Sequence, residues 1–412
     1  MKKFIAVFLL FFIFAFLLVS CTTQQPSEIL IAEIDGSRLY LNDLLSEIEY
    51  WIYLYGMDST EYGSELSDEN ALPTLERMAE EQFNALLAYH VALAKARELG
   101  FDGLTESELS EIQQNAAEDL ANTADYYEDE LRQKYDSLSE EKLQTLLEAE
   151  LSAAGYSETQ LVSYYTNSLI YEKIYSYYTD ALTLDATEVE AGAAQLAEQA
   201  KENYAADPSR YDYDTFFGAT IYYTPANVRR VKHILIALEE EDAAAVQSAY
   251  EAEDTQTAEA LLNEALEKIR GEAEEVYARI QLDPAQFDSV MYELTDDTEV
   301  TENPNGYYIY QESSFYHPSF IEAAFNLKTE GDISGLVATS SGYHILQLEE
   351  IVTEGPTPLE DIYSAAYETL LTQKKETYFS QLTTQWQEEF SIKTYPKRYL
   401  NYLEKHYQEL IE

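Results

Sequence analysis

Apolar residues recur at helical spacing along the first half of the chain. From residue 40 to about residue 205 they return every three or four positions, which places them on one face of each helix. A long helix is expected over 73–99, with Gly100 after it as a left-handed stop. Capping boxes that start helices begin at Thr105, Ser157 and Thr187. The pattern predicts a helical domain of about five or six helices, preceded by a short strand within 29–36.

The pattern changes after this helical domain. The segment 229–236 alternates between apolar and polar positions and then runs apolar, as a central strand does. Further helices are expected at 239–278, 287–294 and 315–327, and further strands at 307–310 and 342–348. This order of elements predicts an α+β domain with a mixed sheet. After a break near residue 355, the helical pattern returns over 359–402.

The net charge excludes one class of function. Lys and Arg number 25 and Asp and Glu number 77, so the formal charge is −52 over 412 residues. A surface this acidic repels phosphate backbones, so no nucleic acid is expected as a partner. Apolar residues still make up 46% of the chain, which is more than a disordered acidic chain carries. The chain can therefore form about two or three folded domains.

The first residues indicate export. A short positive start precedes residues 4–19, which carry no charge. The stretch ends in Leu18-Val19-Ser20-Cys21, which matches the lipobox of bacterial lipoproteins, and Cys21 is the one cysteine of the chain. We therefore expect a lipoprotein signal peptide over 1–20, a diacylglyceryl group on the Cys21 thiol and a lipidated tether over 21–27. The alternative is that the uncleaved first helix is itself the anchor.

Conventional motifs for metals and cofactors are missing from the sequence. The five histidines are His90, His233, His317, His344 and His406. They are scattered and have no cysteine partner at metal-binding spacing, so no zinc site is expected. The glycine-rich fingerprints of nucleotide-binding proteins and the nucleophile elbow of hydrolases do not occur. Neither a metal nor a cofactor is therefore expected, and His90 and His317 are expected to have no specific role.

Three motifs occur in order between residues 231 and 346. Val231-Lys232-His233-Ile234-Leu235 resembles the first strand of a parvulin-type peptidyl-prolyl isomerase domain. The segment 320–334 is similar to that family's following helix and turn, and 339–346 is similar to its closing strand. In the flanks, 31–36 and 94–100 resemble the helical N-terminal module of the PrsA/SurA type of extracytoplasmic folding factor. A lipobox is typical of the Gram-positive foldase lipoproteins of that group.

The resemblance implies four catalytic positions. In the family, two histidines on neighbouring strands share a hydrogen-bond network with a threonine, and these positions fall on His233, His344 and Thr339. Two imidazoles and a hydroxyl can lock one arrangement of donors and acceptors. The family's Cys-or-Asp position falls on Asp297, and the adjacent Asp296 is the alternative.

The resemblance also implies an apolar pocket that binds the proline ring of the substrate. Phe320 matches the family's pocket Phe, and either Tyr316 or Phe315 matches its Met. Tyr308 matches the family's pocket Leu. Many family members have Gly-Gly-x-Leu-Gly before the pocket helix, whereas this chain has Gly306 alone to make the turn. This departure is the reason to consider a non-catalytic alternative.

The expected function is cis–trans isomerisation of X-Pro bonds, together with chaperone activity, at the outer face of the cell membrane. Unfolded or partly folded exported proteins are the expected partners, and the lipid on Cys21 is the expected link to the membrane. The alternative is a non-catalytic chaperone lipoprotein with a degenerate parvulin domain. A solute-binding lipoprotein is disfavoured, because the chain lacks two alternating α/β lobes.

The expected fold is α+β, with a parvulin-like domain inserted into a helical chaperone module. The predicted parts are a helical SurA-like N-terminal domain over 28–205, a connecting segment over 206–228, a parvulin-type domain over 229–352 and a C-terminal helical segment over 353–412. A single C-terminal helix cannot bury its own apolar face. We therefore expect the C-terminal segment to pack on the N-terminal module.

Overall fold

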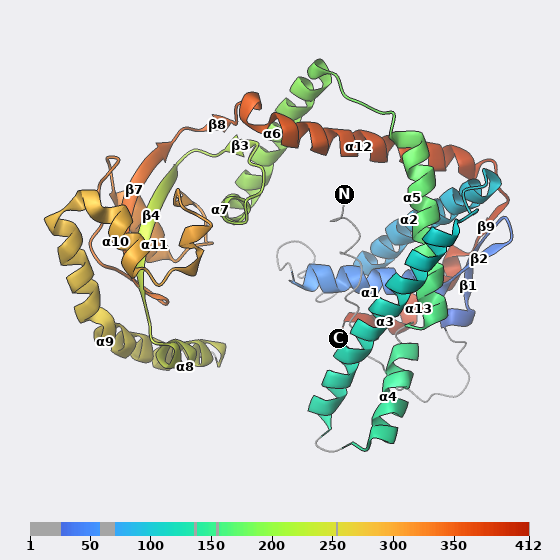
Figure 1. Cartoon of the computed structure of the whole chain (residues 1–412), viewed down its shortest axis with the longest axis horizontal. Coiled ribbons are helices and arrows are strands. Elements are labelled where there is room, and N and C mark those ends of the chain that lie inside the picture. The colour runs from blue at the N-terminus through green and yellow to red at the C-terminus, as the bar shows by residue number, and fades with distance from the viewer. Residues whose placement is uncertain (1–25, 58–70, 136–137, 154–155, 253, 412) are drawn as a thin grey trace. The chain divides into compact units, whose positions relative to one another are not determined.

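The computed structural model describes residues 26–411, apart from 58–70, 136–137, 154–155 and 253 (Figure 1). The predicted signal peptide over 1–20 and the predicted lipidation site Cys21 lie outside the described residues. Across the ranges that the structure covers, no helix is both long enough and apolar enough to cross a bilayer.

The chain forms two compact units, which we call the first unit and the second unit. The first comprises the residues up to Leu182 together with those from Lys374 onward, and the second comprises Thr183–Gln373. The first is a helical module built from both parts of the chain, and the second contains the parvulin-like segment, so the predicted α+β fold with an inserted domain is confirmed. The second unit begins before and ends after the predicted 229–352 domain.

The first unit is mostly helical. Its helices are α1 (Leu41–Met57), α2 (Ala71–Glu98), α3 (Glu106–Lys134), α4 (Glu140–Ala153), α5 (Glu158–Thr179), the last part of α12 (Leu359–Gln387) and α13 (Pro396–Ile411). A short 3-10 helix, η1 (Pro26–Glu28), leads into an antiparallel sheet of β1 (Leu30–Ile34), β2 (Ser37–Tyr40) and β9 (Ile392–Thr394). Strand β1 is central, so segments from both ends of the chain share one sheet.

Two of the three predicted capping boxes start helices where expected. Thr105 caps α3 and Ser157 caps α5. Helix α6 (Ala186–Ala206) is instead capped by Asp185, whose carboxylate accepts the N–H groups of Thr187 and Glu188, both at 2.9 Å. A charged carboxylate that accepts two N–H groups binds them more strongly than the neutral Thr187 hydroxyl, so the helix begins earlier than predicted.

The apolar core of the first unit contains side chains from the C-terminal segment. Phe379 and Trp386 of α12 are buried against α5, with ring centroids 5.6 Å from Tyr171 and 5.2 Å from Tyr178, respectively. Burying a large apolar side chain stabilises a fold by about 1.5–3 kcal/mol. These two rings therefore bind the C-terminal part of α12 to the N-terminal helices of the same unit.

The predicted helix over 359–402 is interrupted. Helix α12 ends at Gln387, strand β9 follows, and α13 begins at Pro396. Proline disfavours a helical conformation in the residue before it and has no N–H to donate to a preceding turn. Ile392 and Thr394 instead pair with β1. The helical spacing hid this break, because proline fits the first turn of the helix that it starts.

The second unit contains a four-stranded sheet with the strand order β5-β4-β7-β6. The long strands β4 (Val228–Ala237) and β7 (Gly342–Val352), both labelled in Figure 1, are central. Strands β5 (Tyr307–Tyr310) and β6 (Val337–Thr339) lie at the edges. All three pairings are antiparallel, whereas a mixed sheet was expected. Apolar periodicity predicts strands but contains no information about their relative direction, which the connections decide.

The second unit contains further helices and a short strand ladder besides this sheet. They are α6, α7 (Pro208–Phe216), α8 (Glu240–Glu251), α9 (Thr255–Leu282), η2 (Pro284–Gln286), α10 (Phe287–Leu294), η3 (Thr298–Thr301), α11 (Pro318–Asn326), the start of α12 and a short ladder of β3 (Tyr223–Thr224) with β8 (Gly355–Pro356). The predicted single helix over 239–278 is two helices. Asp254 starts the second one, because its carboxylate accepts the N–H of Thr257 at 3.1 Å.

Side chains alternate across β4 and β7, so the two faces of the sheet have separate cores. One face packs on α9 and α10 through Ile234, Ile236, Tyr343 and Ile345. The other, which we call the α11 face, packs on α11 through Val231, Leu346 and Leu348. His233 and His344 belong to the α11 face by the same alternation.

Candidate active site

Two histidines from the central strands meet on the α11 face of the sheet. Residue 235 of β4 pairs with His344 of β7, and His233 pairs with residue 346, so the two histidines occupy diagonal positions of the ladder. Their Nδ1 atoms are 3.2 Å apart. Both side chains are buried, with exposed fractions of 9% for His233 and 7% for His344. The structure thus brings the two predicted histidines together.

Thr339 adds a hydroxyl to the hydrogen-bonded pair of histidines. Its Oγ1 lies 2.8 Å from His344 Nε2 and accepts a hydrogen bond from the N–H of Ser341 at 3.1 Å. One arrangement of protons then satisfies every ring nitrogen: the Thr339 hydroxyl donates to His344 Nε2, and His344 Nδ1–H donates to His233 Nδ1. The proton of a neutral His233 is left on Nε2 in this arrangement.

Asp297 lies at the other end of these hydrogen bonds. Its Oδ2 is 3.2 Å from His233 Nε2 and accepts the Tyr307 hydroxyl at 2.5 Å. Its Oδ1 caps η3 through a backbone N–H at 3.1 Å. The alternative, Asp296, instead accepts the N–H of Ala237 at the end of β4, at 2.8 Å. The structure therefore places Asp297, rather than Asp296, beside the histidines.

Burial and hydrogen bonding set the charges in this group. Burial raises the pKa of Asp297, but hydrogen bonds from His233 and Tyr307 outweigh it and bring the pKa to about 2. Burial, together with the nearby His233, lowers the pKa of His344 to about 3. At neutral pH the group therefore contains an ionised carboxylate and an uncharged His344.

Aromatic rings cover the histidines. Phe320 of α11 meets the rings of His233 and His344 edge to face, at centroid distances of 5.3 and 5.1 Å. Tyr316 stacks on Phe320 at 5.6 Å, and Phe315 packs against Tyr316 at 4.9 Å. Tyr316 is therefore the one of the two candidates that contacts Phe320, and Phe315 lies further out. The Tyr316 hydroxyl is buried and has no hydrogen-bond partner among the described residues.

Tyr308 does not belong to this group, which corrects the expectation that it lines the pocket. Tyr307 packs on the α11 face, 5.1 Å from the ring of His233. Tyr308 packs instead with Tyr310 and with Tyr211 of α7. Strand alternation puts neighbouring residues on opposite faces, and only the pairing register tells which of two adjacent tyrosines faces the histidines.

Gly306 lets β5 approach β4 closely. Its φ of 89° lies in the left-handed region, and a Cβ at this position would clash with the backbone oxygen of Val231. The single glycine that remains of the family's longer motif thus sits at the start of the strand that carries Tyr307.

Helix α7 also reaches this group, which the sequence did not predict. Phe216 stacks with Tyr307 at a centroid distance of 6.1 Å and packs against Phe315 at 5.6 Å. The segment 206–228 was expected to be only a connection. The aspartate before a proline at Asp207-Pro208 is a typical helix start, and the Asp207 carboxylate caps α7 by accepting the N–H of Ser209.

Possible metal ligands and the histidines His317 and His90 point to no second site among the described residues. Within the described ranges, no three His, Cys, Asp or Glu side chains gather as metal ligands do. His317 caps α11, because its Nδ1 accepts the N–H of Ser319 at 3.2 Å. His90 lies in α2, where burial lowers its pKa.

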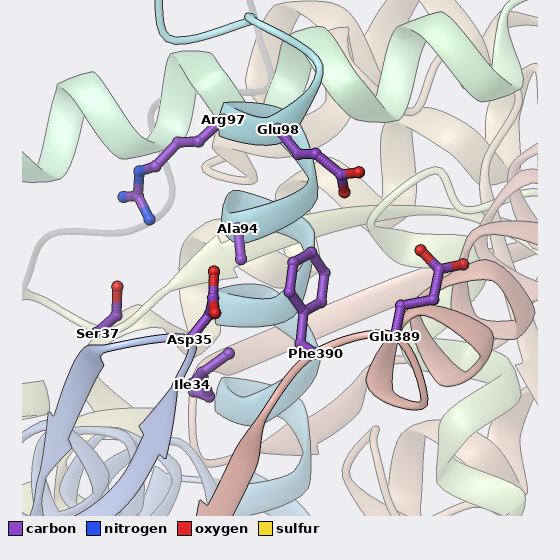
Figure 2. Close-up of a pocket in the computed structure, with 8 residues that line it drawn as sticks. All are labelled: Ile34, Asp35, Ser37, Ala94, Arg97, Glu98, Glu389 and Phe390. Carbon is purple, nitrogen blue, oxygen red and sulfur yellow. The ribbon is translucent and has the colours of Figure 1, made fainter.

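The first unit contains a hollow of about 460 Å³ (Figure 2). It is lined by Ile34, Asp35, Ser37, Ala94, Arg97, Glu98, Glu389 and Phe390. Glu98 and Glu389 both accept hydrogen bonds from Lys95, at 2.9 and 2.7 Å, and Arg97 donates to Asn167 at 3.3 Å. None of the predicted site residues lines this hollow, so the histidine group of the second unit remains the candidate site.

A four-stranded antiparallel sheet that holds two hydrogen-bonded histidines, a threonine and an aspartate under aromatic rings defines a parvulin-type domain. Comparison with known families agrees, since residues 233–350 match the Rotamase family of PPIC-type PPIase domains. The chain is also similar to the foldase protein PrsA of Clostridium botulinum (strain Langeland), with 22% identity over 386 residues that cover 93% of each chain. It is 38% identical to foldase protein PrsA 2 of Listeria innocua over 82 residues, which cover 20% of this chain and 28% of that one.

Among solved structures, the chain is similar to PrsA from Bacillus subtilis. The identity is 16%, the coverage is 88% of this chain and 91% of that chain, and the TM-score is 0.23. The domain match and the similarity to PrsA over most of the chain support the resemblance to parvulin-type foldases of the PrsA/SurA group.

Proposed function

We propose that this protein is a peptidyl-prolyl cis–trans isomerase and chaperone that assists the folding of exported proteins at the outer face of the cell membrane. The observation that carries the proposal is the hydrogen-bonded series Thr339, His344, His233 and Asp297 beneath Phe320.

The proposed reaction needs no covalent chemistry. An X-Pro bond isomerises unaided in tens to hundreds of seconds, over a barrier of about 18–20 kcal/mol that arises from amide resonance. Phe320 offers an apolar ring for the proline of the substrate. The ionised Asp297 and the neutral His344, joined through His233 by hydrogen bonds, supply fixed electrostatics near the twisting bond. Such groups accelerate the reaction when they favour the twisted amide more than the planar one.

An isomerase assay on an X-Pro tetrapeptide tests the enzymatic part. Phe320→Ala and Thr339→Val are expected to lower kcat/KM by about tenfold or more, since tenfold corresponds to about 1.4 kcal/mol of transition-state stabilisation. His90→Gln, in α2 of the first unit, is the matched control for a histidine substitution and is expected to retain the wild-type rate. A wild-type rate equal to that of buffer would contradict the proposal.

The chaperone part rests on the first unit. Its surface exposes the large aromatic side chains of Tyr126, Tyr135, Tyr164 and Tyr177. Exposed aromatic side chains bind apolar segments of unfolded proteins with little loss of rotamer freedom. We therefore expect the full chain to suppress aggregation of a denatured exported protein, and a Phe320→Ala variant to do so equally well.

The alternative is a non-catalytic chaperone with a degenerate parvulin domain. One observation favours it: Phe320 is 4% exposed, since it packs between the histidine rings and Tyr316, and little of its ring is open to a proline. Binding of a proline on Phe320 then requires a neighbouring side chain to move. If Phe320→Ala and His233→Ala leave client folding in cells unchanged, the chaperone activity alone explains the function.

The proposed location at the cell membrane rests on the lipobox at the end of the N-terminal apolar segment. Cleavage before Cys21 and two acyl chains on its thiol would hold the protein stably at the membrane, whereas one chain gives only marginal binding. Metabolic labelling with palmitate is expected in the wild type and absent in Cys21→Ser. A Cys21→Ser protein that stays membrane-bound and unprocessed would show that the first helix is the anchor.

A further inference from the structure

Helix α7 adds aromatic side chains beside the candidate site from outside the matched domain. It spans Pro208–Phe216, whereas the family match begins at residue 233. Tyr213, Phe216 and Phe217 come from this helix and from the residue that ends it. Both segments lie in the second unit.

Several contacts fix α7 in place. Asp212 accepts the N–H of Tyr310 at 2.9 Å, which joins α7 to β5. Ser209 Oγ lies 2.9 Å from Ser314 Oγ and accepts the N–H of Ser314 at 3.0 Å. The loop that carries Phe315 is thus tied directly to α7, so the rings of the helix and of the loop keep one arrangement.

The rings form a continuous path from the histidines to the surface. Phe216 contacts Tyr307, which contacts His233. Beyond Phe216 lie Phe217 at 5.0 Å and Phe315 at 5.6 Å. Tyr213 closes the group, at 4.5 Å from Phe217 and 6.3 Å from Phe315. The outer three rings are open to solvent, with exposed fractions of 50% for Tyr213, 62% for Phe217 and 36% for Phe315.

We propose that Tyr213, Phe217 and Phe315 form a subsite that binds an aromatic or large aliphatic side chain of the substrate near its proline. This inference rests on the proposed isomerase function and names the peptide that the same site prefers. Phe315 is two ring contacts from Phe320, of 4.9 and 5.6 Å, so the centroids of these two rings are at most about 10.5 Å apart. An extended peptide covers that distance in about three residues.

The chemistry of α7 favours an uncharged occupant. Helix α7 has three charged side chains: Arg210 and Asp214 form an ion pair with each other at 2.8 Å, and Asp212 is buried and accepts the N–H of Tyr310. The three rings offer apolar faces and edges, which bind other aromatic rings in stacked or edge-to-face geometry. A clustered, exposed apolar group next to a reaction site is the usual form of a specificity subsite.

The experiment compares two families of X-Pro peptides on the purified full-length chain. In the first family a Phe lies three residues before or after the proline, in separate peptides, and in the second family an Ala replaces that Phe. We expect the wild type to prefer one Phe peptide over its Ala partner by about fivefold in kcat/KM, the size of one aromatic contact. The double variant Tyr213→Ala/Phe217→Ala is expected to lower this preference ratio to about one. Tyr292→Ala, which removes an equally exposed tyrosine from α10, should leave the ratio unchanged.

The outcomes separate this inference from the proposed function. A wild type that isomerises both peptides equally, or a double variant that keeps the wild-type preference, overturns the subsite while the isomerase stands. A wild type with no activity on any peptide overturns the isomerase. In that case fluorescence anisotropy of the labelled peptides still tests the subsite, because weaker binding of the Phe peptide to the double variant supports it and equal binding contradicts it.

Discussion

Asp212 offers a quantitative test of how α7 is held on the second unit. Its side chain is fully buried, its Oδ1 accepts the N–H of Tyr310 at 2.9 Å, and its Oδ2 has no hydrogen-bond partner in the described part of the chain. Burial raises the pKa of this carboxyl to about 7, against the lowering effects of Ser313 and the Tyr310 N–H. The folded chain therefore binds the Asp212 proton more tightly than the unfolded chain does.

The sign of the pH effect follows from linkage. Between about pH 4 and pH 7 the unfolded state has lost this proton and the folded state keeps it, so stability falls as pH rises through that range. The shift is about three pKa units, and at about 1.4 kcal/mol per unit the full loss is about 4 kcal/mol above pH 7. Asp212→Asn keeps the acceptor oxygen and the side-chain volume but cannot ionise. The variant is therefore expected to be more stable than the wild type at pH 8 and to lose that advantage near pH 4.

Hydrogen exchange of the α7 and β5 amides, corrected for the intrinsic exchange rate at each pH, is the suitable assay. Tryptophan fluorescence is not, because Trp51 and Trp386 both belong to the first unit. The matched control is Asp214→Asn on the same helix, at a carboxylate that forms its ion pair with Arg210. A difference between wild type and Asp212→Asn that is the same at pH 4 and pH 8 would refute the reasoning.

Three further predictions concern the candidate site. Gly306→Ala is expected to lower the free energy of unfolding of the second unit by about 2 kcal/mol or more, since residue 306 has a positive φ and the new Cβ would clash with Val231. Urea unfolding measures this loss of stability. Asp297→Asn should remove about 2–3 kcal/mol of stability at pH 7 and well under 1 kcal/mol at pH 2. The lowered pKa of Asp297 stabilises the fold fully above about pH 4, and this contribution is lost as pH falls through about 2. Calorimetry at both pH values checks the difference. Tyr316→Phe removes a buried hydroxyl that has no hydrogen-bond partner among the described residues, so the variant should be more stable by about 1 kcal/mol or more and unfold at a higher denaturant concentration. An unchanged or lower unfolding midpoint contradicts this.

The sequence predicted much of the fold because much of it is local. Apolar spacing located the helices of the first unit, and capping residues such as Thr105 and Ser157 marked their starts. The motifs around His233 and His344 identified two strands, and strand alternation is enough to put both side chains on one face once these strands pair. Those features depend on residues close together in the chain, so they can be recognised without coordinates.

The features of the site that the sequence left open depend on contacts between segments that are far apart in the chain. Asp296 and Asp297 are equivalent in the sequence, and only the packing of their loop against the end of β4 turns Asp297 toward His233. Tyr307 and Tyr308 are likewise interchangeable until the register of β5 on β4 is known. The contacts that dock α7 on the site include a hydrogen bond between Asp212 and Tyr310, which are 98 positions apart. Local spacing says nothing about partners at that separation. Only the tertiary structure therefore showed that Asp297, Tyr307 and helix α7 lie beside the histidines.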